Sequence, residues 1–141
     1  MTNKYEEELK AEGIRVTAVR LLIWRTIRQK MTEAFSLADI ETELLSVDKS
    51  TLFRALVLFT EKGLLHIIND GSGSSKYCVC HCHDHHHHEG HVHLTCTLCH
   101  KTWCLEDVPI PPVAVPQGFI LQESEYIIKA LCPKCQKLVS H

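Results

Sequence analysis

The sequence lacks an excess of charge of either sign. Its 15 Lys and Arg residues are nearly balanced by 17 Asp and Glu residues, which gives a formal net charge of −2 and a pI near 6.6. Proteins that coat nucleic acid or a lipid surface through their overall charge are strongly basic. Any contact with DNA therefore has to come from a local patch of side chains.

The sequence also lacks long apolar runs and a secretory signal. No apolar stretch approaches the roughly 18 residues of a membrane-spanning helix. The N-terminal stretch MTNKYEEELKAEG has neither the apolar core nor the small-residue cleavage site of a signal peptide. We therefore expect a cytoplasmic protein with no membrane partner. At 141 residues the chain has the size of one ordinary domain or two small ones, and we expect two.

Cysteine and histidine, in contrast, are abundant. The chain has eight cysteines and 11 histidines, and most of both lie in the stretch CVCHCHDHHHHEGHVHLTCTLCHKTWC, from Cys78 to Cys104. In a reducing compartment, CxC and CxxC spacings are more typical of metal ligands than of disulfides. Thiolate and imidazole together are the ligands that Zn(II) prefers. The stretch therefore predicts zinc binding.

Two CxxC pairs give the strongest signal. Cys96 and Cys99 form the first pair, and Cys132 and Cys135 form the second. Four thiolates complete a closed tetrahedral site, so we expect a structural zinc that ties together the ends of the second domain. The alternative is a redox-active dithiol, but two pairs favour a metal site. Because a closed site has no vacant position for a substrate, it predicts no catalysis.

More ligand-type residues remain than one ion needs. If KYCVCHC is a strand, Cys78, Cys80 and Cys82 face one side of it, while His91 and His93 share a face of a later strand. The spacing does not choose between Cys78 and Cys80, or between His91 and His93. His66 stands alone at the start of a predicted strand, and such a histidine is more often exposed or hydrogen-bonded to nearby groups. We nevertheless expect a second zinc that bridges the two domains, with ligands drawn from one set: His66, Cys78, Cys80, His91, His93 and Cys104.

Helical periodicity dominates the first half of the chain. We expect helices over residues 4–11, after Thr17, from Ser36 with Asp39 in a capping box, and from about Ser50 to Lys62. The segments LLHII and KYCVC, separated by NDGSGSS, then predict a hairpin. Helices followed by a hairpin are typical of a winged helix-turn-helix, whose last helix reads the major groove. An amphipathic helix with one arginine is, however, more often simply solvated.

Past residue 90 the pattern changes to the period of two that is typical of strands. HVHLTC and KTWCLE predict a strand pair, and FILQESEYIIKALC predicts one long strand that ends at Cys132. The proline-rich segment VPIPPVAVPQG argues against a regular helix between them. The predicted fold class is therefore α+β, with an N-terminal winged helix-turn-helix over residues 1–82 and a small α/β domain over residues 83–141.

Three stretches resemble the ferric uptake regulator family, and together they span nearly the whole chain. GIRVTAVR resembles its opening motif, STLFRAL its recognition-helix motif, and HVHLTCTLC followed by CPKC its histidine and zinc-cage signature. The resemblance implies a dimeric, metal-dependent repressor and not an enzyme, with dimerisation through residues 83–141. Phe53 stands where the family usually has tyrosine. The implied DNA-binding residues lie in the first two motifs: Arg15, Arg20, Ser50, Thr51, Phe53 and Arg54.

Departures from the family pattern bear on the metal. Ala34 stands where iron and peroxide sensors carry a histidine, and Cys78 and Cys104 stand where they carry carboxylates. Because thiolates replace oxygen ligands, the preference shifts from Fe(II) toward Zn(II). His66 and Cys80 match regulatory ligand positions of the zinc uptake regulators, the branch that the chain resembles most. We therefore expect two zinc ions per chain, a structural one and a regulatory one that acts as corepressor.

Other functions remain open from the sequence. A regulator of the same family can sense iron or nickel. A zinc buffer or metallochaperone would use the His/Cys tract but has no need of STLFRAL, and a zinc hydrolase would need a general base, for which Glu89 is the nearest candidate. The expected partners are double-stranded operator DNA and a second copy of the chain, with no small organic substrate.

Overall fold

The structure is a computed structural model that describes all residues except 1, 2, 70, 72, 80–91, 106, 107, 109, 110, 123, 140 and 141. The chain divides into two compact units, with the division between Cys80 and His81. The first is helical with a β-hairpin and the second is built on a sheet, which confirms the α+β class. Among the described helices, none is both long and apolar enough to cross a lipid bilayer.

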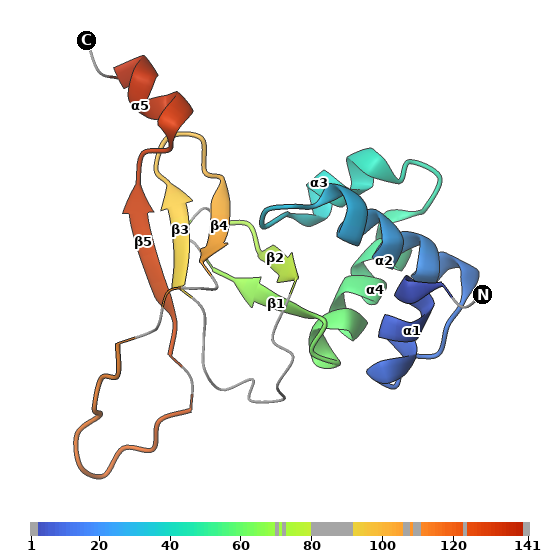
Figure 1. Cartoon of the computed structure of the whole chain (residues 1–141), viewed down its shortest axis with the longest axis horizontal. Helices are drawn as coiled ribbons and strands as arrows, with labels where there is room; N and C mark the ends of the chain where they lie inside the picture. Colours follow the sequence, from blue (N-terminus) through green and yellow to red (C-terminus); the bar gives the residue numbers. More distant parts are fainter. Residues whose placement is uncertain are drawn as a thin grey trace. The chain divides into compact units, whose positions relative to one another are not determined.

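The helices of the N-terminal unit begin where side chains cap them. Thr17 accepts a hydrogen bond from the N–H of Arg20, and Ser36 forms the predicted capping box with Asp39. In chain order the helices are α1 (Lys4–Ala11), α2 (Ala18–Lys30), α3 (Leu37–Glu43) and α4 (Lys49–Glu61) (Figure 1).

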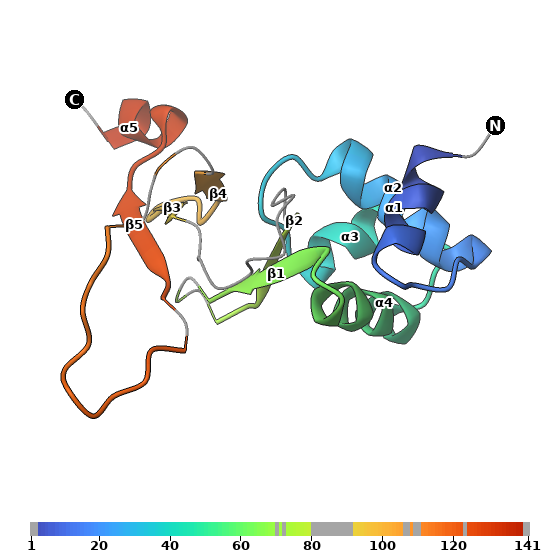
Figure 2. The ribbon, with the colours of Figure 1, turned by 60° about the horizontal axis from the view of Figure 1, so that its bottom comes forward.

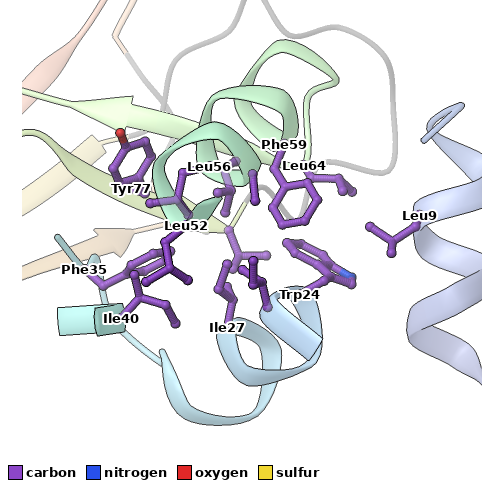
Figure 3. Packing of buried hydrophobic residues seen from close by; sticks show 14 of the residues in the cluster. Leu9, Trp24, Ile27, Phe35, Ile40, Leu52, Leu56, Phe59, Leu64 and Tyr77 are labelled. Atoms are coloured by element: carbon purple, nitrogen blue, oxygen red, sulfur yellow. The ribbon is translucent and has the colours of Figure 1, made fainter. Parts of the chain in front are cut away.

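An apolar core holds these helices together (Figure 3). Leu52, Leu56 and Phe59 of α4 are fully buried, as the periodicity of that helix predicts. The ring of Trp24 from α2 meets the ring of Phe59 edge to face, with 5.5 Å between centroids. Because α4 buries this row of side chains, its opposite face is left for other contacts.

The hairpin is joined to the helices by apolar packing of Leu65, Tyr77 and Val79 in the shared core and by one backbone bridge. Strands β1 (Leu65–Ile68) and β2 (Lys76–Val79) pair antiparallel. Phe35, just before α3, exchanges backbone hydrogen bonds with Tyr77 of β2, at 2.9 and 2.7 Å. This bridge was not predicted, because a single bridging residue has no periodicity in the sequence. The arrangement confirms the predicted winged helix-turn-helix.

The C-terminal unit is built on a sheet with strand order β4-β3-β5. Strand β3 (Val92–Cys96) pairs antiparallel with β4 (Thr102–Leu105) and parallel with β5 (Tyr126–Ala130), and the helix α5 (Pro133–Val139) follows. The strand pair predicted from HVHLTC and KTWCLE is confirmed.

One expectation for this unit is wrong, and one element was missed. The long strand predicted from Phe119 is confined to β5, and a turn closed by the Phe119 N–H and the Pro116 carbonyl at 3.2 Å lies where that strand was predicted to begin. The helix α5 was not predicted at all. Residues 111–122 form no helix or strand, and the absence of a helix over 111–118 agrees with what the prolines indicated.

Candidate metal centre and nucleic-acid interface

Four cysteines converge at one end of the C-terminal sheet. Cys96 ends β3, Cys99 lies in the following turn, Cys132 follows β5, and Cys135 lies in the first turn of α5. Their sulfur atoms all lie within 4.8 Å of one another. Cys96 and Cys135 are buried, whereas Cys132 is half-buried and Cys99 is exposed. The structure therefore brings together the four residues that the two CxxC motifs single out.

The parallel pairing of β3 and β5 explains this convergence, because the carboxyl ends of parallel strands lie at the same edge of a sheet (Figure 1). The N–H of Thr97 donates to the carbonyl of Ala130 at 2.9 Å and so extends the pairing beyond β3. His100 closes the first CxxC turn with a φ of 63°, and its N–H donates to the carbonyl of Cys96 at 3.0 Å.

The sulfur geometry fits a tetrahedral ion. The Sγ atoms of Cys99 and Cys132 are 3.8 Å apart. Zinc–sulfur bonds of about 2.3 Å at the tetrahedral angle place two sulfurs at nearly this separation. The N–H of Cys132 donates to Sγ of Cys96 at 3.4 Å, and the N–H of Cys135 donates to Sγ of Cys132 at 3.5 Å. Backbone donors thus already point at the sulfurs, as the ligands of a thiolate site require.

The pKa of one of the four closely spaced thiols is lowered, and the pKa of another is raised. The backbone N–H groups of Cys132 and Cys99 stabilise the Cys96 thiolate and lower the pKa of this thiol to about 5. The side-chain hydrogen bond with Cys132, together with burial, raises the pKa of Cys135 to about 12. Four thiolates this close repel one another unless a cation neutralises them, and zinc is the cation that this donor set suits.

Two further His–Cys pairs lie within the two units. His66 of β1 is directly opposite Cys78 of β2, and His93 of β3 is directly opposite Cys104 of β4. Directly opposite residues have Cβ atoms about 4.5–5.5 Å apart, so each pair presents an imidazole and a thiol on one face of its hairpin. Cys78 and His93 are buried. The remaining members of the expected ligand set lie outside the described residues: Cys80 and His91.

The exposed face of α4 carries the side chains expected to contact DNA. Ser50, Phe53 and Arg54 are exposed and Thr51 is half-buried. The Nε of Arg54 donates to the carbonyl of Ser50 at 3.3 Å. The face thus combines hydroxyls, one aromatic ring and one guanidinium.

Sequence reasoning missed Asp48, which caps α4. Its carboxylate accepts hydrogen bonds from the hydroxyls of Ser50 and Thr51, both at 2.5 Å, and from the N–H of Thr51 at 3.3 Å. These bonds, that of Ser50 foremost, lower the pKa of Asp48 to about 2. An aspartate just before a run of helical periodicity is a recognised N-cap signal and could have identified it. The predicted start of α4 was therefore one residue late.

The two arginines of the first motif lie next to each other. Gly13, with a φ of 73°, ends α1, and Ile14 is buried in the core. Arg15 follows with an exposed side chain. The guanidinium of Arg20 donates from Nη1 to the backbone carbonyl of Arg15 at 2.9 Å. Arg20 therefore holds the backbone from which Arg15 extends.

The sequence is similar to known proteins over most of its length. The model of the family described as "Ferric uptake regulator family" matches residues 11–129. The chain is 28% identical over 140 residues to the ferric uptake regulation protein of Bordetella parapertussis (strain 12822 / ATCC BAA-587 / NCTC 13253), with 94% of this chain and 96% of that protein covered.

Two solved structures share the fold. One is a zinc uptake regulator complexed with zinc and DNA, with a TM-score of 0.67 and 20% identity, covering 98% of this chain and 94% of that one. The other is the ferric uptake regulator from Pseudomonas aeruginosa with manganese, with a TM-score of 0.63 and 18% identity, covering 92% of this chain and 98% of that one. The chain therefore belongs to the ferric uptake regulator family of metal-responsive transcription regulators.

Proposed function

We propose that this regulator is a zinc-sensing repressor that binds operator DNA as a homodimer, with zinc as corepressor. The observation that carries the proposal is the donor chemistry of the His–Cys pairs. His66 with Cys78, and His93 with Cys104, each combine an imidazole nitrogen with a sulfur. This combination favours Zn(II), whereas Mn(II) and Fe(II) sites are richer in oxygen ligands.

The four-cysteine cluster serves folding in this proposal. A closed tetrahedral site has no open coordination position, so an ion there stabilises the C-terminal unit and does not exchange with the signal. We assign it one zinc per chain, held by the four sulfurs that lie within 4.8 Å of one another.

The signal is a second zinc. We assign its ligands to the His–Cys pairs on the two hairpins. Cys80 is the alternative to Cys78, and His91 is the alternative to His93. Each pair supplies two ligands, so the ion would need both pairs to reach four-coordination. Zinc must favour the DNA-binding arrangement by about 5.5 kcal/mol to move its population from 1:99 to 99:1. The binding free energy of zinc in structural sites is about 10–16 kcal/mol, which exceeds the coupling free energy needed here.

Operator recognition is assigned to α4 and the first motif. An arginine such as Arg54 can donate to guanine, and an apolar ring such as Phe53 suits a thymine methyl. Arg15 would contact the backbone or minor groove. The zinc uptake regulator solved with zinc and DNA, which shares this fold, supports double-stranded DNA as the ligand. Residues 1–65 carry ten basic and ten acidic side chains, so DNA binding without metal should be weak.

The homodimer is supported by the surface of the C-terminal unit. Large apolar side chains are exposed there, among them Phe119 at 69% and Leu138 at 73%. Large exposed apolar side chains on a folded unit commonly mark a contact with another protein surface. A two-fold partner would bury the same surface on both copies. We therefore assign DNA binding to residues 1–82 and dimerisation to residues 83–141.

The test combines metal content with DNA binding. Elemental analysis of the wild type should give two zinc ions per chain, of which mild chelation removes one together with operator binding. Cys78→Ser and Cys80→Ser identify the ligand, since only the true ligand's variant should lack the exchangeable zinc while retaining the other. If zinc loads without changing the affinity for operator over random DNA, the protein is a zinc buffer and the proposal fails.

A further inference from the structure

The segment between β4 and β5 has no part in metal or DNA binding as proposed. We call residues 111–122 the arm. Every residue of the arm is exposed, and its large apolar side chains include Val113 at 67%, Phe119 at 69% and Ile120 at 89% exposed. The arm, PPVAVPQGFILQ, contains no charged residue, which argues against contact with nucleic acid. An uncharged, continuous apolar surface marks a contact with another apolar surface.

The arm is tied down at its base and at its tip. At the base, the hydroxyl of Tyr126 donates to the carbonyl of Pro111 at 2.7 Å. At the tip, the N–H of Phe119 donates to the carbonyl of Pro116 at 3.2 Å, and Gly118 supplies the φ of 95° within this turn. Proline also restricts the backbone, so the arm has less freedom to lose on docking. Figures 1 and 2 show it extending away from β3 and β5.

The same unit also contains an apolar hollow that can receive such a segment. The hollow has a volume of about 370 Å³, and Leu94, Trp103, Leu105 and Leu131 are among the residues that line it. The register places Leu94 opposite both Trp103 and Ile128, so these side chains share one face of the sheet. Ile128 on that face is 47% exposed. The hollow is therefore continuous with an apolar sheet surface.

We propose that the arm docks on this sheet face of a second copy of the chain, with Phe119 and Ile120 in the hollow. The inference rests on the homodimer proposed above and names the segment that holds it together. A second copy fits because the arm and the hollow belong to the same unit and are both apolar. A two-fold axis then lets each copy give an arm and receive one, which closes the assembly at two chains.

The test measures dimer dissociation in the zinc-loaded full-length protein by sedimentation equilibrium. Phe119→Ser with Ile120→Ser should raise the dissociation constant by at least about 100-fold, because each dimer contains two arms and so loses each buried side chain twice. Leu45→Ser is the matched control, since Leu45 is 88% exposed but lies in the N-terminal unit. Both variants should retain the structural zinc, which shows that the C-terminal unit is folded.

A crosslink locates the contact independently of affinity. We would place p-benzoylphenylalanine at position 119, mix unlabelled and ¹⁵N-labelled chains, and map the products by mass spectrometry. Crosslinks between copies that reach Trp103 or Ile128 support arm exchange. Crosslinks confined to one copy, or a dimer whose dissociation constant is unchanged by the arm substitutions, overturn arm exchange. Either result leaves the proposed homodimer standing. A wild type that stays monomeric overturns the homodimer as well.

Discussion

The indole N–H of Trp24 donates a 2.7 Å hydrogen bond to Oε2 of Glu8, and so joins α2 to α1. Arg28 donates from Nε and Nη2 to the same carboxylate, at 3.3 Å each. Trp24 is only 2% exposed, so its N–H has no ready access to water. One partly buried carboxylate therefore ties α1 to α2, in addition to the packing of Leu9 in the core.

Replacing that carboxylate should destabilise the N-terminal unit. Glu8→Ala leaves a buried indole N–H without its acceptor, which costs about 1–3 kcal/mol. Urea unfolding followed by tryptophan fluorescence would measure the loss. Glu7→Ala, at an exposed position of the same helix, is the control and should change stability far less. Equal effects of the two substitutions would show that the Trp24 contact contributes nothing specific.

Loss of one ligand of the four-cysteine cluster should unfold one unit and spare the other. Cys132→Ser removes a sulfur that lies 3.8 Å from Cys99 and accepts from the N–H of Cys135. We expect the structural zinc to be lost and the C-terminal sheet to become accessible to protease, while the helical circular dichroism of the N-terminal unit persists. Cys104→Ser should remove only the exchangeable zinc. A Cys132→Ser protein that keeps its full zinc content would contradict the assignment.

Arg20 should act on DNA through Arg15. Its guanidinium donates to the Arg15 carbonyl at 2.9 Å, so Arg20→Ala should loosen the backbone that carries Arg15. Operator affinity measured for Arg15→Ala, Arg20→Ala and the double variant should then be non-additive, with the double variant little weaker than Arg15→Ala. If Arg20 instead neutralises a phosphate itself, the losses of affinity caused by the two substitutions add. Each substitution then reduces the slope of log affinity against log salt concentration by about one.

The cap of α4 should make stability depend on acid pH. The folded-state pKa of Asp48 is lowered from 3.8 to about 2, so the carboxylate stabilises the folded state above pH 3.8 and this contribution is lost as the pH falls through about 2. The difference in Tm between the wild type and Asp48→Ala should therefore be constant near neutral pH and shrink between these two values. Taking the difference removes acid-induced zinc loss, which affects both proteins. A Tm difference that does not change over this interval would refute the role of the charge.

Loss of the Arg54 side chain should reduce both affinity and base specificity. The guanidinium lies on the exposed face of α4 and its Nε donates to the Ser50 carbonyl, so the other donors remain for a base edge. Arg54→Ala should weaken operator binding by about 1–3 kcal/mol and relax the preference at one base pair. Arg25→Ala, an exposed arginine of α2, is the matched control. Equal weakening on operator and random DNA would place Arg54 on the phosphate backbone instead.

The sequence alone determined the features that depend on neighbouring residues. The CxxC spacing predicted two pairs of metal ligands, the Ser36–Asp39 capping box predicted the start of α3, and the periodicity of α4 predicted its buried face. These signals are local, because a turn, a cap or a helical face is specified within a few residues.

Which distant residues face each other depends on strand pairing and on contacts between elements, and the local sequence does not specify these. Strand register put His66 opposite Cys78 and His93 opposite Cys104, and the parallel pairing of β5 brought the second CxxC pair to the first. The Phe35–Tyr77 bridge and the Trp24–Glu8 hydrogen bond also join residues from different elements. A shift of one residue in register reverses every side chain on a strand, and local periodicity does not specify that register. The partners are therefore set by the packing of the whole unit.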